Sequence, residues 1–262
     1  MEHLITNLIV VLVLTATVSS LIFLFNRVRK FSRISLWLTG GAISLNILYY
    51  LYGIFQNRLI PFSGPADSFL FFAWSIMVIY LAVELKYKTG VFGSFILPLA
   101  LFSSIYALIS PREVDHLLSG SKGAVLVIHA SCAFLGFAAF AFTGGVAIMY
   151  LIQERQLKSK HTSGLLFHRL PALDTLDKLG YHLLLVGFPL LTVSVLSGIL
   201  WSGTSRASYF QLQPKEVWFL IIWILYGILL QARAAVGWGG KKAAYLAISS
   251  FLLACLPLFI IS

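Results

Sequence analysis

The strongest constraint in this sequence is the recurrence of long apolar segments separated by short polar connections. Each is close to or above ~20 residues, the length of helix that crosses the hydrocarbon core of a bilayer. Lipid cannot satisfy backbone N–H and C=O groups, so only helices or a closed barrel can span it. We therefore predict an all-α fold, a polytopic membrane helix bundle of about eight transmembrane helices. The expected spans are residues 4–25, 35–55, 67–86, 91–110, 124–152, 181–202, 216–233 and 241–261.

Composition supports the same class of protein. Hydrophobic residues make up 59% of the chain and charged residues 11%, with a mean hydropathy of +0.92. A water-soluble domain of 262 residues would carry far more charge. The eight spans leave room for short connections only, so we expect residues 1–262 to form a single integral membrane domain. The first span is flanked by the acidic Glu2 and lacks a small-residue cleavage site, which favours a retained helix over a signal peptide.

The net charge of +10 is unevenly distributed along the chain. Alternate connections hold 14 of the 19 Lys and Arg residues, and basic residues concentrate on the cytoplasmic side of membrane proteins. This pattern predicts a multi-pass protein of the bacterial inner (cell) membrane, with both termini outside and segment 201–215 on the outer face. We therefore attribute the positive charge to contact with the lipid bilayer and not to nucleic-acid binding. The long inner connection also holds an apolar stretch, Leu165 to Leu179, compatible with an interfacial helix.

The stretch from Trp201 to Arg233 joins a polar segment to an apolar one. Pro214 is suited to the first position of a helix, because its missing N–H would have no partner there. Glu216 would then place negative charge on the first turn, where the helix dipole favours it. The sequence therefore predicts an outer loop over 201–215 that ends where a transmembrane helix begins.

The residues of this stretch resemble a known motif. Tyr209, Pro214-Lys215-Glu216-x-Trp218 and Gln231-x-Arg233 resemble the membrane haem-handling proteins of c-type cytochrome assembly, of the CcsA and CcmC type. In that family a tryptophan-rich outer loop, close to WGxYWxWDPKExW, holds haem. In this chain the family's other tryptophans and its Asp are replaced, by Arg206, Phe210, Leu212 and Gln213.

The resemblance extends over about residues 60–255. Asp67-Ser68 followed by Phe71-Phe72-Ala73-Trp74 fits a family segment, and we expect an N-cap at Asp67 or Ser68. Leu176-Asp177 and Gly187-Phe188-Pro189-Leu190-Leu191-Thr192 also fit, as scaffold, with Pro189 expected to kink its helix.

His129 lies near the outer end of the fifth span. An ionisable residue within a span is costly and usually faces a partner, a cavity or a cofactor. Imidazole is the usual axial ligand of haem iron, and the resemblance places a family histidine here on the haem-binding face. The alternative is a structural histidine that only hydrogen-bonds a backbone carbonyl or water.

The resemblance implies a haem site on the outer face, with His129 as the iron ligand. Haem would be b-type and non-covalent, because neither Cys132 nor Cys255 belongs to a CxxCH motif. His182 is expected at the cytoplasmic end of its span, on the order of 20–30 Å away, and cannot share the iron. The predicted cofactor-binding residues are His129, Trp201, Arg206, Tyr209, Phe210, Lys215 and Trp218.

The sequence shows no Ser/His/Asp arrangement, no paired carboxylates on one helix face and no Gly-rich phosphate loop, so we do not expect an enzyme. The resemblance implies an integral membrane haem-handling protein of c-type cytochrome assembly, with haem and other assembly or haem-synthesis proteins as partners. The alternative is a HemX-like membrane regulator or scaffold of tetrapyrrole biosynthesis that acts through a partner enzyme. Gln231 stands where CcsA-type proteins have a histidine, which bears on this choice.

Overall fold

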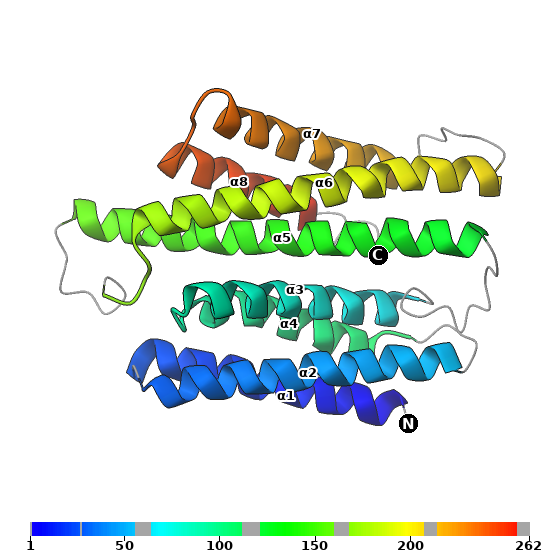
Figure 1. The fold of residues 1–262 in the computed structure, drawn as a ribbon, viewed down its shortest axis with the longest axis horizontal. Coiled ribbons are helices and arrows are strands. Elements are labelled where there is room, and N and C mark those ends of the chain that lie inside the picture. Colours follow the sequence, from blue (N-terminus) through cyan, green and yellow to red (C-terminus); the bar gives the residue numbers. More distant parts are fainter. Residues whose placement is uncertain are drawn as a thin grey trace. The chain divides into compact units, whose positions relative to one another are not determined.

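The structure is a computed structural model that describes residues 2–26, 28–55, 64–111, 121–159, 168–206 and 214–255. Within these ranges it describes all side chains except those of 121–123, 201–206 and 214–215. The described backbone is helical, without strands, which confirms the all-α prediction (Figure 1). Within these ranges the helices are α1 (Glu2–Asn26), α2 (Arg29–Phe55), α3 (Pro65–Tyr87), α4 (Phe92–Ile109), α5 (Ser121–Lys158), α6 (Leu173–Arg206), α7 (Pro214–Ala234) and α8 (Gly240–Cys255).

Helix length and surface both fit a membrane environment. Among the described residues, seven helices, α1 to α7, are long and apolar enough to cross a bilayer. The described part of α8 has 16 residues, and the rest of its expected span lies outside the description. Large apolar side chains point away from the packed interiors, as Trp37 and Phe55 do at 81% and 85% exposure. Such surfaces suit lipid contact, so the chain is a multi-pass membrane protein.

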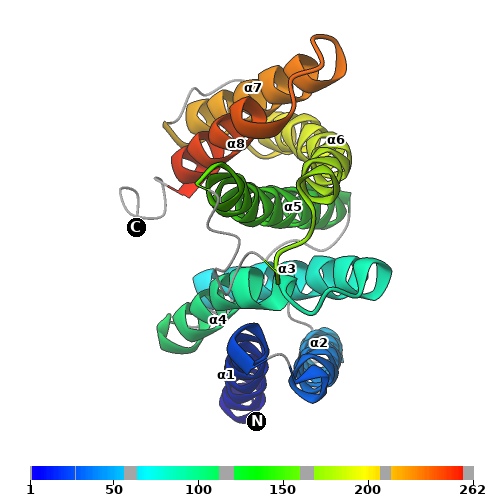
Figure 2. The ribbon, with the colours of Figure 1, turned by 90° about the vertical axis from the view of Figure 1, so that its left-hand side faces the viewer.

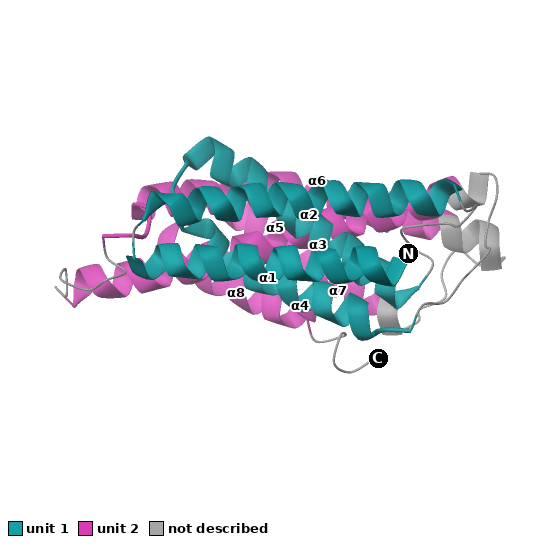
Figure 3. Cartoon of the chain, turned by 90° about the horizontal axis from the view of Figure 1, so that it is seen from below, with its two compact units in different colours: residues 1–123 teal, residues 124–262 magenta. Residues whose placement is uncertain are grey.

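The chain divides into two compact units, unit 1 over Met1–Gly123 and unit 2 over Ala124–Ser262 (Figure 3). In unit 1, α1 packs on α2 and α4, and α3 packs on α2 and α4. Ser94 Oγ of α4 donates to the Ser20 carbonyl of α1 at 2.7 Å, one of the interhelical hydrogen bonds that polar side chains make inside membranes. The expectation that residues 1–262 form one membrane domain stays a prediction.

The start of α3 differs from the sequence prediction. Gly64 is the N-cap, and Pro65 lies in the first turn. Asp67 is therefore inside the helix, where its carboxylate accepts a hydrogen bond of 2.5 Å from the Tyr49 hydroxyl of α2. The N-cap predicted at Asp67 or Ser68 was wrong because Pro65 already has the backbone angle of a first helical residue.

In unit 2 the four helices lie around a common centre, as the view along their length shows (Figure 2). Helices α5 and α6 approach closely at two glycines, since a Cβ on Gly136 would lie 3.2 Å from the Gly187 carbonyl oxygen. Helix α8 packs on α5 through Phe251, and a Cβ on Gly144 would lie 3.2 Å from its ring. Small residues at helix contacts are typical of membrane bundles.

Aromatic side chains fill the centre of unit 2. The rings of Phe140 (α5) and Tyr226 (α7) stack with centroids 3.5 Å apart. Trp223 of α7 donates its indole N–H to Thr192 Oγ1 of α6 at 2.9 Å and stacks on Phe188. These contacts connect α7 to both α5 and α6.

Two helices of unit 2 are longer than their predicted spans. Helix α5 continues from the predicted end at 152 to Lys158, and α6 begins at Leu173 instead of 181. Each extension carries an ion pair one helical turn apart, Lys158 with Glu154 and Lys178 with Asp174, both at 2.7 Å. Such pairs support helix outside the hydrocarbon. The predicted interfacial helix was therefore wrong from Leu173 onward, because that stretch belongs to α6.

Candidate functional site

The start of α5, the end of α6 and the start of α7 lie at one end of unit 2, on the right in Figure 1. We call this the His129 end. Helix α7 begins at Pro214 with Glu216 in its first turn, as predicted. Helix α6 continues to Arg206, so the connection between α6 and α7 is shorter than the predicted loop over 201–215.

The predicted site residues fall into three groups. His129 and Trp218 have described side chains. Trp201, Arg206 and Lys215 have helical backbones in α6 or α7, and their side chains are outside the description. Tyr209 and Phe210 lie outside the described residues.

His129 lies in α5, eight residues after its first residue, or about two turns. Its Nδ1 is 2.7 Å from the carbonyl oxygen of Ser194 in α6. A carbonyl only accepts, so we assign the proton to Nδ1, which donates to it. In the neutral imidazole this leaves Nε2 unprotonated, as a metal ligand requires. The Ser194 hydroxyl is 3.3 Å from the same Nδ1.

Gly198 allows the imidazole to lie against α6. It follows Ser194 by one turn, and a Cβ at this position would lie 2.8 Å from His129 Cε1 and 2.9 Å from Nδ1. A real side chain would therefore displace the ring. Sequence reasoning missed Ser194. The available signal was two small residues four apart in one span, facing a histidine in another.

The part of α5 near its start is less covered than its centre. Among the described residues, none from Ala124 to Leu135 is buried, whereas every residue from Ala138 to Ala147 is. Ile128, next to the histidine, is 50% exposed. His129 therefore lies on a partly uncovered, mainly apolar surface that a flat apolar ligand can contact.

Trp218 lies near the start of α7, at the His129 end. It is half-buried, and its indole N–H donates to the Leu253 carbonyl of α8 at 3.2 Å. The described contacts thus connect Trp218 to α8 and His129 to α6, and none of them joins the two side chains.

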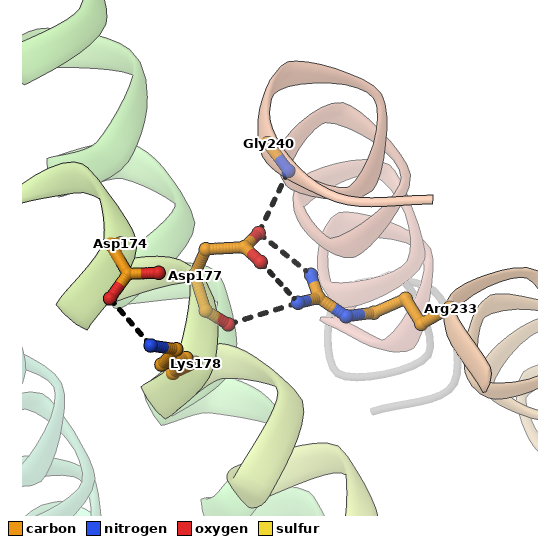
Figure 4. Close-up of polar contacts among 5 residues, drawn as sticks. All are labelled: Asp174, Asp177, Lys178, Arg233 and Gly240. Carbon is orange, nitrogen blue, oxygen red and sulfur yellow. Dashed lines mark hydrogen bonds and ion pairs between the residues drawn. The ribbon is translucent and has the colours of Figure 1, made fainter. Parts of the chain in front are cut away.

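The opposite end of unit 2, which we call the Arg233 end, holds a polar cluster (Figure 4). Arg233 of α7 donates to both carboxylate oxygens of Asp177 in α6, at 3.2 and 2.8 Å, and to its backbone carbonyl at 3.0 Å. The Gly240 amide at the start of α8 donates to the same carboxylate at 2.8 Å. The Arg233 guanidinium also lies over the Tyr181 ring, 5.3 Å from its centroid. One carboxylate thus joins α6, α7 and α8.

The other metal-ligating side chains do not assemble around His129. His182 is exposed and precedes Ser194 by twelve residues of α6, about 18 Å of helix rise. This spacing agrees with the prediction that it cannot share an iron with His129. Cys132 and Cys255 are both free. Within the described ranges no group of three or more His, Cys, Asp or Glu residues could hold a metal ion.

Fold and site together define a polytopic helical membrane protein with a histidine oriented by a neighbouring helix. The family model described as "Cytochrome C assembly protein" matches residues 63–262. The chain is 29% identical to the cytochrome c biogenesis protein CcsA of Pyropia yezoensis, over 76% of this chain and 74% of that protein. It is 28% identical to CcsA of Microcystis aeruginosa, over 82% of this chain and 80% of that protein. The chain belongs to the family of cytochrome c assembly proteins.

Proposed function

We propose that this protein handles haem during c-type cytochrome assembly, with His129 as the axial ligand of the iron. The observation that carries the proposal is the hydrogen bond between His129 Nδ1 and the Ser194 carbonyl, which leaves Nε2 as the coordinating nitrogen. A second group that holds the other nitrogen fixes the tautomer and the ring orientation of a metal-bound histidine. The names of the relatives support the assembly role, since they are cytochrome c biogenesis proteins.

The residues present fit a non-covalently held, b-type haem. An imidazole nitrogen suits ferrous and ferric iron, and the partly exposed apolar surface between Ala124 and Leu135 suits a porphyrin face. Haem itself is the cargo that c-type cytochromes require. Cationic side chains would pair with its propionates, and aromatic ones would cover the ring. We assign the first role to Arg206 and Lys215, and the second to Trp201, Tyr209, Phe210 and Trp218.

Removal of the His129 imidazole tests the ligand assignment. The protein is purified from haem-replete cells, and the ratio of Soret absorbance to protein is measured. We expect His129→Ala to lose the haem absorbance while membrane insertion and yield are retained. The matched control is His182→Ala, an exposed histidine of the same unit, which should keep wild-type absorbance. Full occupancy in His129→Ala would reject His129 as the ligand.

The orientation of the protein is part of the same proposal. The charge distribution favours the cytoplasmic side for the Arg233 end and the outer side for the His129 end. A reporter fused after Arg206 should give an outer-side signal, and one fused after Lys160 a cytoplasmic signal. The reverse pattern would move the haem site to the cytoplasmic face and contradict the proposal.

A second function, a membrane regulator or scaffold of tetrapyrrole synthesis, is favoured by one observation. Gln231 occupies the position of a family histidine and is exposed at the end of α7, so this chain has no histidine there to bind haem. Wild-type protein that carries no haem, yet co-purifies with an enzyme of haem synthesis, would favour the regulator over the haem carrier.

A further inference from the structure

A groove at the Arg233 end of unit 2 has no role in the proposed haem site. It lies between the end of α5 and the start of α8 and has a volume of about 580 Å³. Its lining residues combine cationic and apolar side chains. They are Leu151, Ile152, Glu154, Arg155, Lys158, Ser159, Lys241 and Tyr245.

The charge of the groove is positive. It holds three cationic side chains, those of Arg155, Lys158 and Lys241, against the single carboxylate of Glu154. Glu154 is already paired with Lys158 at 2.7 Å. Arg155, Lys158 and Lys241 are exposed, so an incoming anion can reach them without displacing packed side chains.

The start of α8 adds to this positive potential. Lys241 and Lys242 follow Gly240 directly, and the first turn of α8 contains no acidic residue. Cations at a helix N-terminus repel the positive end of the helix dipole. An anion bound beside Lys241 would relieve this repulsion. The Asp177 carboxylate relieves it only at the Gly240 amide, from which it accepts a hydrogen bond.

The apolar part of the groove fits the acyl chains of a lipid. Leu151 and Ile152 belong to the spanning part of α5, and Tyr245 of α8 is 55% exposed. Lys241 Nζ lies 5.6 Å from the centroid of the Tyr245 ring. The cations thus lie at the end of a membrane-facing apolar surface, where headgroup phosphates are found.

We propose that this groove binds the headgroup of an anionic phospholipid, with Arg155, Lys158 and Lys241 contacting the phosphate and Leu151, Ile152 and Tyr245 contacting the acyl chains. Basic pockets between transmembrane helices bind such headgroups at the cytoplasmic side of other membrane proteins. The bound lipid would hold α8 against α5, at the end where Asp177 already joins α8 to α6.

Native mass spectrometry of the full-length protein tests the proposal. The protein is exchanged into detergent with equal amounts of dioleoyl phosphatidylglycerol and dioleoyl phosphatidylcholine, and retained lipids are counted. We expect phosphatidylglycerol to be retained preferentially. Each cation removed should weaken its retention about fivefold, and the triple variant Arg155→Gln/Lys158→Gln/Lys241→Gln on the order of a hundredfold.

The chain offers a matched control for Lys158. Lys178 lies at the same end of unit 2 and outside the groove, and its side chain is 67% exposed against 69% for Lys158. Each lysine pairs with a carboxylate one turn away at 2.7 Å. Lys158→Gln should therefore weaken phosphatidylglycerol retention about fivefold, and Lys178→Gln should leave it unchanged. This pair decides the question even where the triple variant is not recovered from the membrane.

Three results would overturn the proposal. Equal retention of the two lipids would show annular contact only. Equal losses in Lys158→Gln and Lys178→Gln would show a general charge effect. If millimolar inorganic phosphate competes as effectively as the lipid does, the groove is a site for free anions. We expect inorganic phosphate to displace no lipid.

Discussion

The two ends of unit 2 are built in opposite ways. At the Arg233 end, one carboxylate receives hydrogen bonds from a guanidinium of α7 and an amide of α8. At the His129 end, one imidazole nitrogen is held by a carbonyl of α6, and the surrounding turns of α5 contain no buried residue among those described. The first arrangement stabilises the fold, and the second leaves the other imidazole nitrogen for the haem iron of our proposal.

Because of this difference, we expect substitutions of the polar residues at the two ends to have different consequences. A partly buried charge that loses its oppositely charged partner carries a large free-energy cost. A neutral histidine carries no charge, and its second nitrogen can remain without a protein partner at a modest cost. Changes at the Arg233 end should therefore lower stability, and changes at the His129 end should lower ligand binding.

The largest effect is expected for Arg233→Ala. The arginine side chain is 9% exposed and its partner Asp177 is 29% exposed, so the variant leaves a poorly hydrated carboxylate without its cation. We expect a loss of about 3 kcal/mol in the free energy of unfolding, measured by denaturant titration in detergent. Lys178→Ala, which removes an exposed ion pair of the same helix, should change it by less than about 1 kcal/mol. Equal losses of unfolding free energy in the two variants would mean that the Arg233–Asp177 pair stabilises the protein no more than an exposed ion pair does.

Gly198→Ala should be next in size and should act at the other end. The added Cβ would lie under 3 Å from two ring atoms of His129, so the ring must rotate or move away from Ser194. Overpacking of this kind costs about 1–3 kcal/mol, and we expect haem occupancy to fall roughly tenfold with little change in yield. Gly180→Ala is the control in the same helix, since its Cβ would meet only Val146 at 3.9 Å. Unchanged occupancy in Gly198→Ala would contradict the ring position.

Ser194→Ala separates the two contacts of the imidazole. The short hydrogen bond is to the backbone carbonyl, which the substitution keeps, and the hydroxyl is more distant at 3.3 Å. We expect a change in haem affinity of at most about threefold, corresponding to the lower end of one hydrogen bond, measured by titration of haem into the apoprotein. A complete loss of binding would show that the hydroxyl, and not the carbonyl, orients His129.

The smallest effect is expected for Gln231→His. This substitution introduces the histidine that the family resemblance places here, but the position is exposed on α7 at the Arg233 end. Because residue 231 is exposed, the new imidazole should add no low-spin haem signal to the visible spectrum of haem-replete protein. A new signal would reveal a second haem site and would weaken the contrast between the two ends.

Helix number and type were predictable from sequence because lipid offers no hydrogen-bond partners to backbone groups. An apolar run of ~20 residues has few alternatives to a spanning helix, and α1 to α7 confirm the expected pattern. Helix ends were less predictable. The pair Lys158–Glu154 extends α5 beyond its apolar run, and Pro65 starts α3 before the expected N-cap. Local polar interactions decide such positions, and hydropathy does not record them.

The sequence by itself determined that this is an all-helical membrane protein and singled out His129, because an ionisable side chain in an apolar run is costly and therefore conspicuous. Only the tertiary structure decided which nitrogen of His129 is held and what Asp177 joins. The carbonyl that orients the histidine lies 65 residues away in the chain, and Asp177 meets Arg233 and Gly240 across 56 and 63 residues. Backbone carbonyls and amides are the same in every residue, so only the packing of helices can select which of them a distant side chain meets.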